Sequence, residues 1–157
     1  MKSLITPLEV HRHAFAGGAL LSAGAVTETD ILTAEERFLR PVFGAALLDA
    51  LREGKYADLL ADYVVGCLAL LTRVVLQPQL DLQTTAIGTL APKGEHGTAA
   101  DTTELRRLHQ NLRHRAQTLL RRASEYVEAH AERFPEYDPR ANILNRCTTY
   151  GGFVQVH

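Results

Sequence analysis

Apolar residues recur three and four positions apart along most of the chain, with charged and polar residues between them. This is the period of an amphipathic α-helix that buries one face. It predicts helices over roughly 6–15, 27–40, 41–54, 56–77 and 101–134. We therefore expect an all-α fold, a helical bundle with one long helix in its C-terminal half, an extended loop at 78–100 and an extended C-terminal arm.

Capping residues mark the start of the first two helices. Thr6 and Glu9 match a capping box around Pro7, a residue that suits the first helical position. Thr27 and Asp30 have the same spacing. Two separate helices are therefore expected near the N-terminus.

Two prolines are expected to interrupt the helices that follow. Pro41 should end one helix and open another, because the residue before a proline disfavours helical geometry. The face of that new helix would carry Val42, Ala45, Leu48 and Leu51. The next helix should stop before Pro78.

The stretch 63–71 has no charged residue on any face, so its helix is expected to be central. It is too short to cross a bilayer. Its apolar stripe and that of the long helix each need a partner, so we expect them to pack on each other. The residues concerned are Val64, Leu68, Leu71 and Val75 on one side and Leu112, Leu119 and Ala123 on the other.

The connection 78–100 breaks the helical pattern. Residues 80–83 alternate like a strand, 84–89 have the composition of a strand or hairpin, and 92–97 resemble an exposed turn. A connection of this length is usually functional or mobile.

The last twenty residues, 138–157, differ from the helical domain 1–137. Residues 153–156 alternate like a strand that has no obvious partner in its own chain, and Gly151-Gly152 would act as a hinge. An arm of this kind is expected to bind a neighbouring subunit or another partner by strand addition. Its contacts would be Ile143, Leu144, Phe153 and Val154, and the alternative is a tail that folds onto its own domain.

The long helix carries a basic segment, with Arg106, Arg107, Arg113, Arg115, Arg121 and Arg122 beside His109 and His114. These arginines could contact a phosphate backbone or an acidic partner subunit. The favoured alternative is a solvated face whose arginines pair with the acidic N-terminal half, since no aromatic residue interleaves. That half offers Glu28, Asp30, Glu35, Glu36, Asp49, Glu53, Asp58 and Asp62.

Composition and motifs mainly exclude classes of function. A net charge of −1 over 157 residues gives no overall attraction to nucleic acid or an acidic membrane. Cys67 and Cys147 are interpreted as free thiols of a reduced, cytosolic protein without a leader segment. No histidine pair, carboxylate pair, nucleophile elbow or phosphate loop has the required spacing. We therefore predict no catalytic residue, no metal site and no cofactor.

The chain also resembles a known family. Segments 4–7, 34–44 and 47–51, together with 134–137, 142–145 and 151–153, resemble small helical phage head–tail connector (adaptor) proteins of the kind found in Bacteroidetes prophages. The resemblance covers most of the chain except 78–100, and its motifs are structural rather than catalytic.

The resemblance implies a homo-oligomeric ring in a virion or phage-like particle, assembled in the bacterial cytoplasm without a membrane. The ring would dock on the portal protein, carry tail-completion proteins and let DNA pass through it. A nucleic-acid-binding regulatory domain that uses the arginine-rich helix 105–122 is the alternative from another class. An enzyme of unrecognised type is the third.

Overall fold

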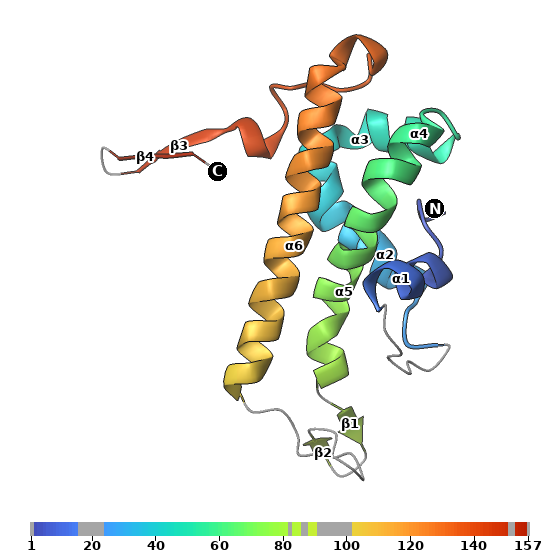
Figure 1. The fold of residues 1–157 in the computed structure, drawn as a ribbon, viewed down its shortest axis with the longest axis vertical. Helices are drawn as coiled ribbons and strands as arrows, with labels where there is room; N and C mark the ends of the chain where they lie inside the picture. The colour runs from blue at the N-terminus through green and yellow to red at the C-terminus, as the bar shows by residue number, and fades with distance from the viewer. Residues whose placement is uncertain are drawn as a thin grey trace.

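Helix α5 (Val65–Asp81) lies at the centre of the fold in the computed structural model, which describes residues 2–15, 24–81, 83–85, 88–90, 102–150 and 153–156. Helices α1 (Pro7–Ala14) and α2 (Glu28–Ala34) pack on one side of α5, and α6 (Thr102–Ala129) packs on the other (Figure 1). The remaining helical elements are η1 (Glu35–Leu39), α3 (Arg40–Arg52), α4 (Ala57–Leu59), η2 (Leu60–Val64), η3 (Ala131–Arg133) and η4 (Ile143–Asn145). The predicted all-α fold with a long C-terminal-half helix is confirmed.

The two predicted capping boxes are present. The Thr6 hydroxyl accepts a hydrogen bond from the backbone N–H of Glu9 at 3.3 Å, and the Glu9 carboxylate accepts one from the N–H of Thr6 at 2.7 Å. Thr27 and Asp30 repeat both bonds at the start of α2. Four backbone N–H groups that a helix start would leave unpaired are thus satisfied by local side chains.

The predicted helix break at Pro41 is wrong. The chain stays helical through Pro41 because η1 is a π turn, in which the N–H of Arg40 donates to the carbonyl of Glu35. The break falls instead at Gly44, with φ of 78° and ψ of 163°, a conformation that favours glycine. It changes the helical register, so Ala45 is exposed although it was expected on the buried face.

The predicted end of the central helix before Pro78 is also wrong, since α5 continues to Asp81. Pro78 lies close to the C-terminal end of α5, where a proline removes one backbone hydrogen bond and few helical turns follow it. Side chains hold the last turn: Gln77 donates to the Asp81 carboxylate at 2.9 Å, and His109 of α6 contacts the same carboxylate.

The helical run Ala57–Asp81 is therefore 25 residues long, and its most apolar 18-residue window has a mean hydropathy of 2.0, enough by length and composition to span a membrane. Half of its most apolar window is buried within the fold. The core helix of a soluble protein has the same length and composition, so this run does not distinguish the two.

Helices α5 and α6 pack on each other, and η2, which contains Val64, also contacts α6. Leu68 and Ala123 are fully buried, and Val75 and Leu119 are partly buried against the same cluster. Burial of both stripes agrees with the prediction that the central and long helices pack on each other.

The connection after α5 contains a short antiparallel hairpin, β1 (Gln83–Thr85) with β2 (Gly88–Leu90). This agrees with the hairpin expected in 84–89, whereas residues 80–81, expected to be strand, belong to α5. The predicted turn at 92–97 lies outside the described residues.

The C-terminal strand has a partner in its own chain, which corrects the prediction of an unpaired arm. Strand β4 (Phe153–Val156) pairs antiparallel with β3 (Cys147–Tyr150), and Tyr150 is opposite Phe153. Gly151-Gly152, expected to be a hinge, therefore separates two paired strands. A Gly-Gly pair after a β-branched and aromatic run is a hairpin signal that the sequence interpretation missed.

Candidate interaction surface on the long helix and the C-terminal segment

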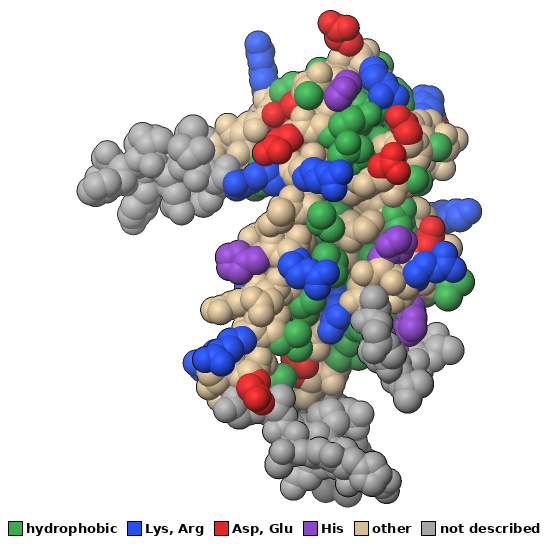
Figure 2. All heavy atoms as spheres, viewed as in Figure 1, with side chains coloured by type: hydrophobic (Ala, Val, Ile, Leu, Met, Phe, Trp, Pro, Cys, Tyr) green, Lys and Arg blue, Asp and Glu red, His purple; other side chains and the backbone are tan. Residues whose placement is uncertain are grey.

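The exposed side of α6 is basic. The six arginines between Arg106 and Arg122 are all exposed, and no Asp or Glu occurs from 105 to 124. The opposite side of the helix is apolar and buried, with Leu112, Ala116, Leu120, Ala123 and Val127. Figure 2 shows basic side chains along the middle of α6. The amphipathic pattern of α6 thus presents its arginines to solvent.

These arginines do not pair with the acidic N-terminal half, which corrects the favoured expectation. Within the part of the chain that the structure describes, Arg106, Arg107, Arg113, Arg115, Arg121 and Arg122 make no ion pair. The acidic residues bind other groups, in the pairs Glu35–Arg52, Asp49–Arg52, Glu36–Arg40, Glu53–Lys55 and Asp58–Arg133. The positive charge of α6 is therefore not neutralised by these pairs.

The charge of α6 affects a neighbouring helix. Burial, and after it the charge of Arg115, lowers the pKa of Arg73 on α5, while Asp81 acts in the opposite direction. Arg73 also lies over the ring of Phe15, with its guanidinium carbon 4.5 Å from the ring centroid. Arg115 of α6 thus acts electrostatically on Arg73 of the core helix.

Aromatic rings do lie beside the basic surface, although the sequence suggested none. The rings of Tyr63 and Tyr126 stack with centroids 4.1 Å apart. The guanidinium carbon of Arg122 lies over the Tyr63 ring, 5.1 Å from its centroid, and the ring centroids of His130 and Tyr126 are 4.4 Å apart. Tyr63 belongs to η2 and is far from Tyr126 in the sequence, so no local sequence pattern could predict that the two rings stack. Each tyrosine ring thus stacks on the other and contacts at least one further side chain of the same subunit.

The first part of the C-terminal segment is held on α6. Asn142 is fully buried, and its amide nitrogen lies 2.8 Å from both the Ser124 hydroxyl and the Tyr137 hydroxyl. Tyr137 donates in turn to Glu128 at 2.9 Å, and Asn145 donates to the same carboxylate. Residues 138–146, expected to be free, are therefore attached by a buried polar network.

The predicted arm contacts lie in two places. Ile143 is 49% exposed and Leu144 is partly buried against the core, both at the base of the segment. Phe153 and Val154 belong to β4, in the hairpin that projects away from α6 (Figure 1). The structure brings Ile143 and Leu144 together with Arg113 in one groove, but Phe153 and Val154 are not among its described lining residues.

An apolar groove lies between η1 and α3, α5 and α6, with a volume of about 450 Å³. Sequence analysis did not predict it, because residues from five separate elements, η1, α3, α5, α6 and η4, form it. Its described lining residues are Arg37, Phe38, Pro41, Val42, Leu71, Val74, Val75, Pro78, Arg113, Ala116, Gln117, Leu120, Ile143 and Leu144.

The described residues contain no cluster of three or more His, Cys, Asp or Glu side chains suited to a metal ion. Cys67 is a buried free thiol, and burial raises its pKa to about 12. A thiol with that pKa is a poor nucleophile at neutral pH.

These features define a small all-α bundle protein with a basic long helix and a projecting C-terminal hairpin. The chain belongs to DUF6712, a family of unknown function, whose model matches residues 33–146. The match includes the basic surface and the groove but not the hairpin. No curated protein and no solved structure matches the chain.

Proposed function

We propose that the protein is a structural subunit of a phage-like particle, a head–tail connector that forms a homo-oligomeric ring between the portal protein and the tail-completion protein. The observation that carries the proposal is the basic face of α6, whose arginines have no ion-pair partner in the described part of their own subunit. The sequence resemblance to connector proteins points to the same role. Assembly would take place in the bacterial cytoplasm, and DNA would pass through the ring.

Charge is segregated along the chain in a way that suits contact between copies. Residues 28–62 carry eight carboxylates against four basic side chains, whereas residues 102–124 carry six arginines against one carboxylate. A head-to-tail ring brings two different surfaces of the subunit together. Some arginines among Arg106, Arg113, Arg115, Arg121 and Arg122 would then meet carboxylates of the next subunit, which favours one orientation.

The C-terminal hairpin would provide a second contact. A two-stranded sheet has two outer edges with unpaired backbone groups, and such edges are usually covered by another strand. In this proposal β3 and β4 reach a neighbouring subunit or the partner beside it, with Phe153 and Val154 as apolar anchors. Asn142 and its partners attach the chain to α6 shortly before the hairpin.

The oligomeric state tests the proposal. We expect light scattering and negative-stain images of the full chain, alone or with the portal protein, to show rings. Arg113→Glu with Arg115→Glu should weaken assembly, whereas Arg113→Lys with Arg115→Lys should retain it because the charge is kept. A monomer that binds neither itself nor a portal would contradict the proposal.

A nucleic-acid-binding domain is the second candidate, favoured by the same unpaired arginines. Binding through them would be mainly to phosphates, since the described tyrosine rings beside them are already stacked. A monomer or dimer that binds duplex DNA with an affinity falling steeply with salt would support this candidate. We expect the connector not to bind a duplex sequence-specifically at physiological salt.

A further inference from the structure

The groove between η1, α3, α5 and α6 has an apolar floor. Leu71, Val42, Ala116 and Leu120 are buried beneath it. Above them, Phe38, Val74 and Val75 are partly exposed, and Ile143 at one end is among the two most exposed large apolar side chains of the described residues. The described part of the subunit thus leaves a concave apolar surface open, of the size that a partner's side chains can fill.

Two arginines from different elements line the groove. Arg37 of η1 is exposed and its guanidinium lies 5.2 Å from the ring centroid of Phe38. Arg113 of α6 also lines the groove, and Gln117 lies one helical turn after Arg113. Neither arginine makes an ion pair within the described residues, and no described lining residue is acidic.

The length of the groove limits what can enter it. Its floor follows α5 from Leu71 to Pro78, which is about 10 Å at the rise of an α-helix. That length matches about two helical turns, with apolar side chains one turn apart. Carboxylates on both flanks of such a segment would face Arg37 and Arg113.

We propose that this groove binds a short amphipathic helix of another protein, whose apolar stripe fills the groove and whose acidic flanks pair with Arg37 and Arg113. This is binding of a helix in a groove, with two charge pairs fixing its position. Arg113 is also among the proposed ring contacts, so Arg37, which lies outside α6, separates this site from ring formation.

The probe is a synthetic helical peptide of about fourteen residues with leucines one turn apart and glutamates on both flanks. Two matched peptides replace all its glutamates with lysine or all its leucines with serine. Fluorescence anisotropy with the full chain should give at least about tenfold tighter binding for the acidic leucine peptide than for either control. Equal binding of the lysine peptide would overturn the proposal.

Paired substitutions locate the binding. Arg37→Ala with Arg113→Ala should weaken binding of the acidic peptide about tenfold, whereas Arg12→Ala with Arg107→Ala, neither of which is a proposed ring contact, should leave it nearly unchanged. All four arginines are exposed, so these variants are expected to fold. An equal loss in both variants would show general attraction to a basic surface and overturn the proposal.

A second copy of the chain is the competing occupant. Hydrogen exchange of the backbone amides in 71–78 distinguishes a helix of another protein from a second copy as the occupant. It is measured at rising protein concentration without peptide, and again after the acidic peptide is added. Exchange that stays unchanged with concentration but slows on addition of the acidic peptide supports the proposal. Protection that rises with protein concentration, together with self-association, would assign the groove to another copy and overturn it.

Discussion

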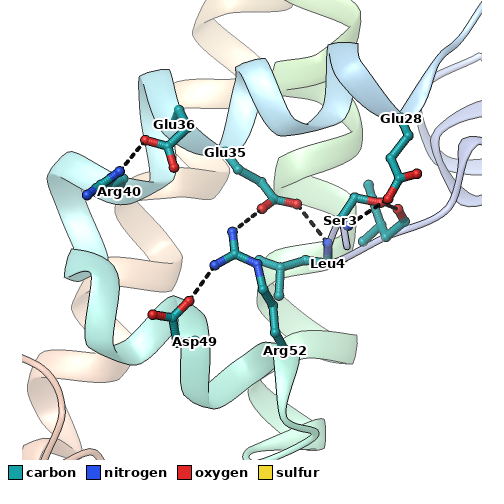
Figure 3. Close-up of polar contacts among 9 residues, drawn as sticks. Ser3, Leu4, Glu28, Glu35, Glu36, Arg40, Asp49 and Arg52 are labelled. Atoms are coloured by element: carbon teal, nitrogen blue, oxygen red, sulfur yellow. Dashed lines mark hydrogen bonds and ion pairs between the residues drawn. The ribbon is translucent and has the colours of Figure 1, made fainter. Parts of the chain in front are cut away.

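Glu35 and Arg52 form an ion pair inside the fold, with Oε2 of Glu35 2.6 Å from Nη2 of Arg52 (Figure 3). The Glu35 side chain is 0% exposed and that of Arg52 is 14% exposed. The other oxygen of Glu35 accepts a hydrogen bond from the N–H of Leu4 at 2.7 Å. Burial acts to lower the pKa of Arg52, but the bonds and charges of Glu35 and Asp49 make the net shift upward. One carboxylate thus joins the N-terminal segment, η1 and α3.

Glu35→Ala should destabilise the fold by about 3 kcal/mol, because it leaves Arg52 largely buried without its closest partner and frees the N–H of Leu4. The matched control is Glu36→Ala, which removes an exposed pair with Arg40 and should cost less than about 1 kcal/mol. Urea denaturation measures both. Equal losses of unfolding free energy in the two variants would show that the buried Glu35–Arg52 pair stabilises the fold no more than the exposed Glu36–Arg40 pair.

Leu68→Ala should cost about 2 to 5 kcal/mol, because Leu68 is 0% exposed in the core of α5. Leu8→Ala is the control on α1, where the side chain is 66% exposed, and should change stability by less than about 0.5 kcal/mol. Thermal or chemical unfolding of the two variants tests the assignment of α5 as the central helix. A loss at Leu68 below about 1 kcal/mol would contradict it.

Thr6→Ala should shorten or fray α1 and cost about 1 kcal/mol. In the folded chain the backbone and side-chain bonds from Thr6 hold the pKa of Glu9 below its usual 4.5. A depressed pKa means that this carboxylate stabilises the fold above pH 4.5 and loses its effect as the pH falls through the lower folded value. NMR titration should show the pKa of Glu9 rising toward 4.5 in Thr6→Ala but unchanged in Thr27→Ala.

Shortening the chain should distinguish the attached segment from the hairpin. A chain that ends at Arg146 keeps Asn142 and its bonds, so its helical circular dichroism and melting temperature should stay close to those of the full chain. A chain that ends at Arg140 loses the buried Asn142 and should melt at a lower temperature, since Ser124 and Tyr137 lose their partner. Identical melting of both shortened chains would contradict the role of this network. In the proposed connector, the chain ending at Arg146 should fold yet fail to join the assembly.

The sequence by itself determined the helices and most of the core. Thr6 with Glu9 and Thr27 with Asp30 act within four residues, so the start of each helix could be predicted from neighbours in the chain. The apolar period likewise placed Leu68 and Ala123 in the core, because helical spacing alone brings such residues to one face. Local rules were wrong at Pro41 and Pro78, where a π turn and the bonds of Gln77 and His109 to Asp81 keep the chain helical.

Only the tertiary structure decided which charges are neutralised and which surfaces are open. The sequence shows acidic and basic segments, but it does not show that Arg52 rather than an α6 arginine pairs with Glu35. The groove forms only where Phe38, Val74 and Ala116 meet, and these residues belong to three different elements. The buried site of Asn142 likewise depends on its hydrogen bond to Ser124 of α6. These contacts join residues far apart in the chain, and their geometry depends on how whole helices pack, which no local pattern encodes.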